Sequence, residues 1–85
     1  MAITKLVFLV QAGTFADPAN AQAMLMKLQA LDQQLAVRLD AETTETRVLN
    51  RVLVGSYGTR AEAEALRRRM RSWGIGGLVR EVAAL

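Results

Sequence analysis

Two polar side chains interrupt apolar stretches of the sequence and have the chemistry to bind a ligand. Gln11 follows the apolar run 6–10, and Arg51 lies inside the stretch 48–55, which is rich in valine and leucine. A glutamine amide both donates and accepts hydrogen bonds, and a guanidinium can hold a carboxylate through two parallel hydrogen bonds. These two residues are the first candidates for a binding site. The alternative for Arg51 is a solvated side chain whose stem covers the leucines beside it.

Enzymatic and metal chemistry have little support in the residue types. The 85 residues include no cysteine and no histidine, which removes thiolate nucleophiles, the usual general base and the commonest transition-metal ligand. The acids Asp40, Glu42 and Glu45 lie on a predicted edge or loop, whereas glycan-cleaving enzymes need two carboxyl groups held across a cleft. We therefore expect a binding module with no catalytic residue, no metal and no cofactor.

The two candidate residues lie on predicted strands that are apolar on both faces. In the stretch 48–55, valines dominate the even positions, and the odd positions carry two leucines around Arg51. In the first predicted strand, 6–12, Gln11 shares its face with Leu9. A strand with one solvated face normally alternates apolar with polar residues. The second face is therefore either covered by another layer or is an open apolar surface that contains these polar groups.

Two helix starts carry capping signals. Asp17 and the proline that follows it begin a predicted helix, because aspartate is a good N-cap and proline fits the first helical position. That helix is expected to end near 32–33. Thr59 with Glu62 three residues later has the capping-box pattern and begins a second helix, which Gly74 is expected to cap at its C-terminal end.

The remaining elements predict a single small α+β domain with the order β-α-β-β-α-β. Further strands are expected over 34–40, which alternates with period two, and over 76–82. The chain also repeats itself: when Gly13 is placed on Gly55, the pair 37–38 falls on the pair 79–80, Val-Arg in both cases. The economical packing is a ferredoxin-like, ribonucleoprotein-like sandwich, in which both helices cover one face of a four-stranded antiparallel sheet.

The first and third strands are expected to lie in the centre of this sheet. The domain is predicted to span 6–82, after a disordered N-terminus or cloning remnant at 1–5 and before a C-terminal tail at 83–85. No apolar run is long enough to cross a membrane, and the first residues lack the features of a signal peptide. If the protein is exported, we expect this chain to be an excised piece.

The charge of the chain is mildly basic. The formal net charge is +3 and the pI is about 10.2, which favours an anionic partner but is too weak to indicate nucleic acid. The arginines within 67–71 are interpreted as the solvated side of the second helix, opposite an apolar stripe that ends at Trp73.

Several motifs together resemble the SPOR domain, the sporulation-related repeat. They are the stretch 10–15, Val-Gln-Ala-Gly-Thr-Phe, and the stretch 49–57, Leu-Asn-Arg-Val-Leu-Val-Gly-Ser-Tyr, each followed by a capped, alanine-containing helix. The family pattern is V-Q-x-G-S-F, then Y/W-x-R-V-x-V-G-P-F. The resemblance covers about 6–82. The chain departs from the family pattern at three positions: it has Thr14 where the family has serine, Leu49 where the family has an aromatic residue, and Ser56 where the family has proline.

The resemblance implies a β-α-β-β-α-β fold that binds peptidoglycan, at glycan strands whose stem peptides have been removed. It also implies a bacterial envelope protein, periplasmic and targeted to the division septum, whose other domains can include an amidase or a lytic transglycosylase. Matched by motif, glycan contacts fall on Gln11, Thr14, Leu49, Arg51 and Val79. The leucines Leu9 and Leu53 on the open face complete the predicted site.

Two other functions share this topology. The leucines of the open face could form a homodimer core, as in a regulatory ACT-type domain that binds a small ligand at its strand edges. An RRM reads RNA bases by stacking them on aromatic residues of the central strands, but the predicted open face carries no aromatic residue. We therefore expect a monomer that binds glycan strands, does not bind nucleic acid and does not span a membrane.

Overall fold

A computed structural model of the chain describes residues 5–84. The elements in chain order are β1 (Lys5–Phe15), α1 (Pro18–Leu31), β2 (Val37–Thr43), β3 (Val48–Tyr57), α2 (Arg60–Ser72) and β4 (Leu78–Ala84). Both outer strands therefore extend beyond the predicted domain limits, β1 by one residue and β4 to residue 84. What was predicted for 1–4 and for 85 lies outside the described residues.

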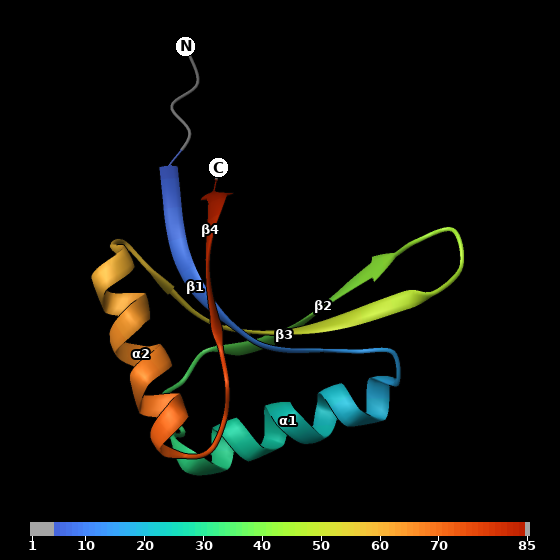
Figure 1. Cartoon of the computed structure of the whole chain (residues 1–85), viewed down its shortest axis with the longest axis horizontal. Helices are drawn as coiled ribbons and strands as arrows, with labels where there is room; N and C mark the ends of the chain where they lie inside the picture. The colour runs from blue at the N-terminus through green and yellow to red at the C-terminus, as the bar shows by residue number, and fades with distance from the viewer. Residues whose placement is uncertain (1–4, 85) are drawn as a thin grey trace.

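The four strands form one sheet with the order β2-β3-β1-β4, and each neighbouring pair is antiparallel (Figure 1). The prediction of an α+β fold with two helices on one face of this sheet is confirmed, as is the central position of β1 and β3. No helix in the described part of the chain is long and apolar enough to cross a membrane.

The core lies between the sheet and the two helices. Val10 and Val52 from the central strands are fully buried against Ala21 of α1 and against Ala63 and Met70 of α2. The alanines let the helices approach the sheet closely, and every buried side chain of this cluster is apolar. Both helices pack against this one face, so neither helix covers the opposite face of the sheet.

The capping predictions for both helices are confirmed. The Asp17 carboxylate accepts a hydrogen bond from the backbone N–H of Ala19 at 2.8 Å. The Thr59 hydroxyl accepts from the backbone N–H of Glu62 at 3.3 Å, and it donates to the Glu62 carboxylate at 2.9 Å. Gly74 follows α2 with a φ of 79°, a left-handed conformation that glycine adopts without a steric penalty.

The predicted position of the second strand was wrong by three residues. The strand was expected over 34–40, but β2 runs from Val37 to Thr43. Asp32 explains the late start: its backbone carbonyl accepts from the N–H of Leu35 at 3.2 Å, and its carboxylate accepts from the N–H of Gln34 at 3.0 Å. These bonds hold a turn after α1, so the chain cannot enter the sheet earlier. The predicted loop at 41–45 correspondingly shrinks to 44–47.

Two glycines in the central strands lie under aromatic rings. A Cβ added to Gly13 would lie 2.7 Å from the ring of Phe15, and one added to Gly55 would lie 2.3 Å from the ring of Tyr57. Gly55 also has a φ of 86°, a conformation that side chains disfavour. In both places the ring two residues later occupies the space that any larger residue would need.

Gly55→Ala is therefore expected to lower the free energy of unfolding by about 2 kcal/mol, because it combines a left-handed backbone with displacement of the Tyr57 ring. In a domain of this size that lowers the melting temperature by about 10 °C. Gly58→Ala is the matched control, since nothing lies within 4 Å of the added Cβ and its φ is not positive. Equal melting temperatures for the two variants would contradict this account.

Asp32 also links the two helices. A guanidinium nitrogen of Arg69 in α2 donates to the Asp32 carboxylate at 2.7 Å, and the same guanidinium lies 5.3 Å from the ring centre of Trp73. The hydrogen bond from Arg69, supported by the backbone N–H of Gln34, holds the pKa of Asp32 below its usual value of 3.8. This contact lies on the helix side of the sheet, away from the open face.

Because the pKa of Asp32 is lower in the folded state, its charge stabilises the fold at neutral pH, and this contribution is lost as the pH falls through the folded pKa. Asp32→Asn keeps the acceptor for Gln34 and removes the charge. It is expected to be less stable than the parent at neutral pH and equally stable once the pH lies below the folded pKa, where Asp32 is protonated in both the folded and the unfolded state. Urea unfolding at several pH values measures this, and a stability difference that did not change with pH would contradict it.

Candidate ligand-binding face

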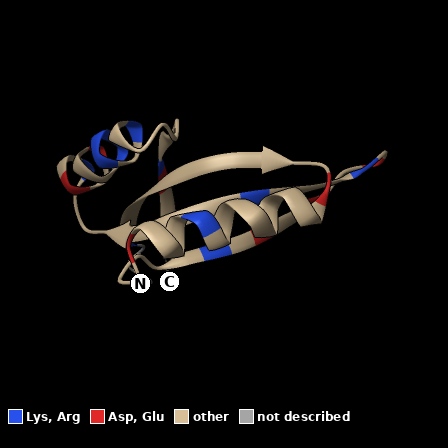
Figure 2. Cartoon of the chain, turned by 90° about the horizontal axis from the view of Figure 1, so that it is seen from below, with Lys and Arg blue, Asp and Glu red and all other residues tan. Residues whose placement is uncertain are grey.

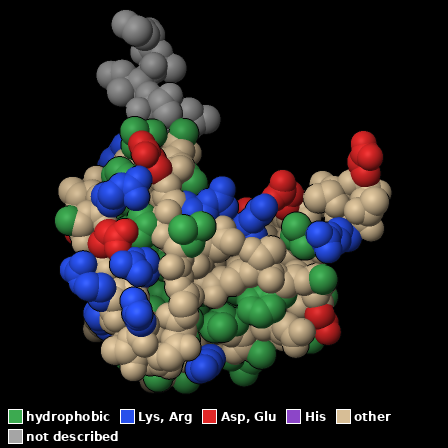
Figure 3. Space-filling view, viewed as in Figure 1, with side chains coloured by type: hydrophobic (Ala, Val, Ile, Leu, Met, Phe, Trp, Pro, Cys, Tyr) green, Lys and Arg blue, Asp and Glu red, His purple; other side chains and the backbone are tan. Residues whose placement is uncertain are grey.

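The face of the sheet opposite the helices is called the open face. Opposed residues in an antiparallel sheet project to the same side, so the strand registers identify its members. They are Lys5, Val7, Leu9, Gln11 and Thr14 from β1; Arg38, Asp40 and Glu42 from β2; Leu49, Arg51 and Leu53 from β3; and Leu78, Arg80 and Val82 from β4. The sheet is bent, and the open face lines a hollow between the outer ends of β1 and β4 and the β2–β3 hairpin (Figure 3).

A β-bulge in β1 brings two of the predicted residues together. Gln11 is opposite Leu53 of β3, but Gly13 is opposite Val52, so Ala12 is an extra residue in β1. In a regular strand Gln11 and a residue three positions later would project to opposite faces. The extra residue places Thr14 on the open face beside Gln11, whose amide nitrogen donates to the Thr14 hydroxyl at 2.7 Å.

Gln11 is also bound from the other side. A guanidinium nitrogen of Arg80 in β4 donates to the Gln11 side-chain oxygen at 3.0 Å. The amide of Gln11 therefore connects Arg80 to Thr14: its oxygen accepts from Arg80 and its nitrogen donates to Thr14, and these two bonds fix its orientation. These three side chains form the polar chain of the open face, which runs from β4 across β1.

Arg51 lies on the open face as predicted, opposite Thr14 on one side and Asp40 on the other. Its guanidinium forms an ion pair with Glu42 of β2. The Arg51 side chain is 22% exposed, whereas that of Glu42 is 50% exposed. The structure therefore brings together Gln11, Thr14 and Arg51, and it adds a carboxylate partner for Arg51 that the sequence reading did not assign.

Leu9 and Leu53 are on the predicted face but are not exposed. Leu9 is 1% exposed and Leu53 is 5% exposed, and both lie apart from the cluster under the helices. In register they are flanked by long side chains, Leu9 by Arg80 and Leu53 by both Gln11 and Arg38. The prediction of an exposed apolar surface was therefore wrong at its centre, because these two leucines are buried between longer polar side chains of the adjacent strands.

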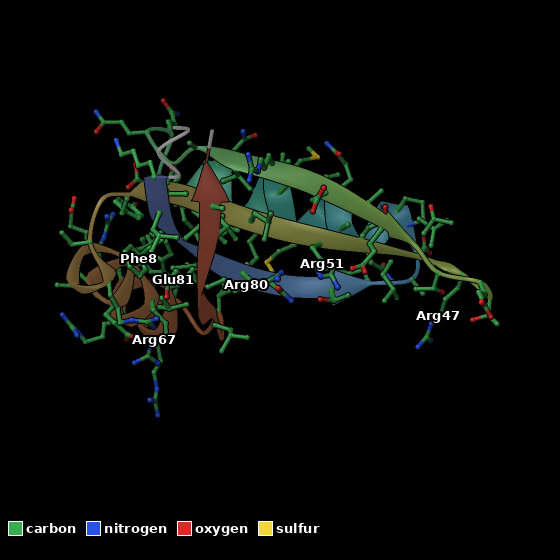
Figure 4. The ribbon with its side chains drawn as sticks, turned by 90° about the horizontal axis from the view of Figure 1, so that it is seen from above. Phe8, Arg47, Arg51, Arg67, Arg80 and Glu81 are labelled. Carbon is green, nitrogen blue, oxygen red and sulfur yellow. The ribbon has the colours of Figure 1, made fainter. Side chains whose placement is uncertain are left out.

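Val79 was predicted to face the ligand, and this placement was wrong. It is opposite Val10 and packs against the core under the helices. Its neighbour Arg80 is opposite Leu9 and projects to the open face (Figure 4). Arg80 was not among the predicted site residues. Leu78, Arg80 and Val82 alternate with Val79, so the pairing with β1 places these three residues on the open face and Val79 on the helix side.

The open face has no stacking platform for a base or a sugar. The sequence contains four aromatic residues, and Phe8, Phe15, Tyr57 and Trp73 all pack against the core on the helix side. This agrees with the prediction that the open face carries no aromatic residue. Leu49, at the position of the family aromatic, is half-buried on the open face beside Glu42.

Residues 5–84 enclose no pocket, and within the same range no group of three acidic side chains is placed to hold a metal ion. The site is instead a shallow, polar-lined surface across the middle of the sheet. A surface of this kind suits an extended ligand that lies across several strands, because a small molecule gains most of its affinity from being enclosed.

Comparison with known families decides the assignment. The family model of the SPOR domain matches residues 7–81 of the chain. The chain belongs to the SPOR domain family. A search of the curated proteins found no match.

Two solved structures share the fold of this SPOR domain. One is the crystal structure of the SPOR domain of RlpA from Pseudomonas aeruginosa, with a TM-score of 0.75 at 24% identity, covering 87% of this chain and 96% of that one. The other is the solution structure of the peptidoglycan-binding domain of the cell wall lytic enzyme CwlC from B. subtilis, with a TM-score of 0.72 at 20% identity, covering 96% of each chain.

The ion pair between Glu42 and Arg51 is expected to contribute little to the stability of this SPOR domain, because Glu42 is half exposed to solvent. Glu42→Gln should change the free energy of unfolding by less than about 1 kcal/mol in urea titrations. A loss of more than about 2 kcal/mol would instead mean that the pair holds β2 on the sheet.

Proposed function

We propose that this SPOR domain binds peptidoglycan through its open face, at glycan strands that lack stem peptides. The observation that carries the proposal is the polar chain from Arg80 through Gln11 to Thr14, which crosses a sheet face that neither helix covers. Family membership supports the proposal, as does the fold shared with a domain described as peptidoglycan-binding.

The chemistry of a peptide-free glycan strand fits this surface. Such a strand carries hydroxyls and N-acetyl amides along its length and a lactyl carboxylate on each muramic unit. Gln11 and Thr14 offer hydrogen bonds to hydroxyls and amides. An arginine of the open face, such as Arg80, offers paired N–H donors to a carboxylate. The half-buried Leu49 and the exposed Leu78 provide apolar surface for sugar rings at either side of the polar chain.

Affinity must come from several sugars together. Each exposed hydrogen bond contributes on the order of 1 kcal/mol, so a single sugar would bind weakly. The open face extends across four strands, so it has room for consecutive units of one strand. A stem peptide on the bound units would have to enter the same hollow, where the β2–β3 hairpin rises on one side (Figure 1).

We further propose that the domain acts as a targeting module in the bacterial envelope, on the periplasmic side, and that it concentrates its parent protein at the division septum where peptide-free glycan is made. The proposed module is a monomer and does not catalyse glycan cleavage. Asp40 and Glu42 both project from β2 and do not flank a cleft, and Glu42 is already paired with Arg51.

The proposal is tested by sedimentation of the domain with intact sacculi and with sacculi treated with an amidase that removes stem peptides. The parent should sediment with the treated sacculi and much less with the intact ones, and it should not bind RNA. Gln11→Ala should weaken binding to treated sacculi about tenfold, because two hydrogen bonds of the polar chain are lost.

Gln22→Ala is the matched control, because it makes the same change on the exposed side of α1. It should bind like the parent. Equal sedimentation with intact and treated sacculi would contradict the preference for peptide-free strands. If Gln11→Ala bound like the parent while keeping its melting temperature, the open face would not be the site.

A further inference from the structure

The charges of the open face are unevenly distributed. On the β2–β3 side, Arg38 and Arg51 lie among Asp40 and Glu42, so the formal charges cancel. On the β1–β4 side, Arg80 is surrounded by Leu9, Gln11 and other uncharged residues, Lys5 lies at the outer end of β1, and the open-face positions of these two strands include no acid. Arg51 and Arg80, which both lie beside β1, therefore have opposite electrostatic surroundings.

Arg51 is already neutralised. Glu42 forms an ion pair with its guanidinium, and Asp40 lies directly opposite it on the same face. An incoming carboxylate would have to displace Glu42 and would be repelled by both acids. It would exchange one carboxylate partner for another, and the net gain from that exchange is small.

Arg80 has no such competitor among the described residues. Its guanidinium donates to the uncharged side-chain oxygen of Gln11, a contact that orients the guanidinium over the sheet and leaves its remaining N–H donors for a ligand. The adjacent acid, Glu81, projects to the helix side, where it lies 3.7 Å from Arg60. Figure 4 shows Arg51 and Arg80 reaching over β1 from the two strands that flank it.

We propose that Arg80, and not Arg51, binds the carboxylate of the glycan ligand, and that Glu42 makes this selection by neutralising Arg51. The inference rests on the proposed function and identifies the group that is recognised. A stem peptide is joined to the muramic lactyl group through an amide, and its removal restores a free carboxylate. Arg80 therefore distinguishes peptide-free units by the negative charge of the free carboxylate, in addition to the steric exclusion of the peptide.

The test compares two versions of the same ligand. Glycan strands released by amidase carry free lactyl carboxylates, and coupling with ammonia through a carbodiimide converts these to carboxamides of nearly the same size. Binding of each version is measured by calorimetry with the parent domain. The parent should bind the carboxamide strands about tenfold more weakly, the loss expected for one charge-assisted contact.

Variants then locate the contact. Arg80→Gln should bind the carboxylate strands about tenfold more weakly than the parent and should bind both ligands equally. Arg80→Lys, which keeps the charge, should retain part of the preference. Arg68→Gln is the matched control: it removes the same charge from the exposed side of α2, away from the open face, and should leave the preference for carboxylate strands intact.

Glu42→Gln is expected to strengthen binding, whereas Arg80→Gln weakens it. It frees Arg51, so binding of carboxylate strands should become several-fold tighter, and binding of carboxamide strands should not change. The inference is overturned if the parent binds both ligands equally, or if the preference disappears in Arg51→Gln and survives in Arg80→Gln. Failure of the parent to bind either ligand would instead overturn the proposed function.

Discussion

One extra residue in β1 decides what the open face presents. Ala12 interrupts the pairing with β3, so the alternation of β1 changes phase between Gln11 and Thr14. As a result the same strand places two polar side chains next to each other on one face and Phe15 in the core on the other. A regular strand would have directed Thr14 toward the helices, where its hydroxyl would need a buried partner. The polar chain therefore depends on a local irregularity of the backbone.

The fold itself was largely predictable, because its determinants are local. Aspartate and threonine at the N-caps, glycine after α2 and the alternation of the central strands each specify an element within a few residues. The order of the strands followed from the repeated pattern and from the two-layer packing. The start of β2 was not predicted correctly. It depends on a turn held by two hydrogen bonds to Asp32, and the residue types of this stretch do not indicate those bonds.

The candidate site was predictable only in part. Gln11 and Arg51 were placed correctly because each is a polar residue at a known position of an alternating strand. Val79 was misplaced and Arg80 was missed because the face of an edge-strand residue depends on its register with the neighbouring strand. The burial of Leu9 and Leu53 depends on how long side chains from adjacent strands lie over them in a bent sheet, which is a property of tertiary structure.

The positive charge of the chain is concentrated on α2. The arginines of α2 outnumber its glutamates by five to two, which equals the formal net charge of +3 for the whole sequence, and Figure 2 shows the contrast with α1. Some of this charge is used within the fold, as in the contacts of Arg69 with Asp32 and of Arg67 with Glu64. The basic isoelectric point is therefore a poor guide to the charge of the open face, which lies on the other side of the sheet from α2.

The first and last strands place both ends of the domain at one corner. Lys5 of β1 is paired with residue 84 of β4, at the end of the sheet remote from the β2–β3 hairpin (Figure 1). A fluorescent protein or an affinity handle fused to either terminus would thus leave from the same point, clear of the hairpin side. Because both connections leave from this corner, a flexible tether at either end would restrain the domain at the same point.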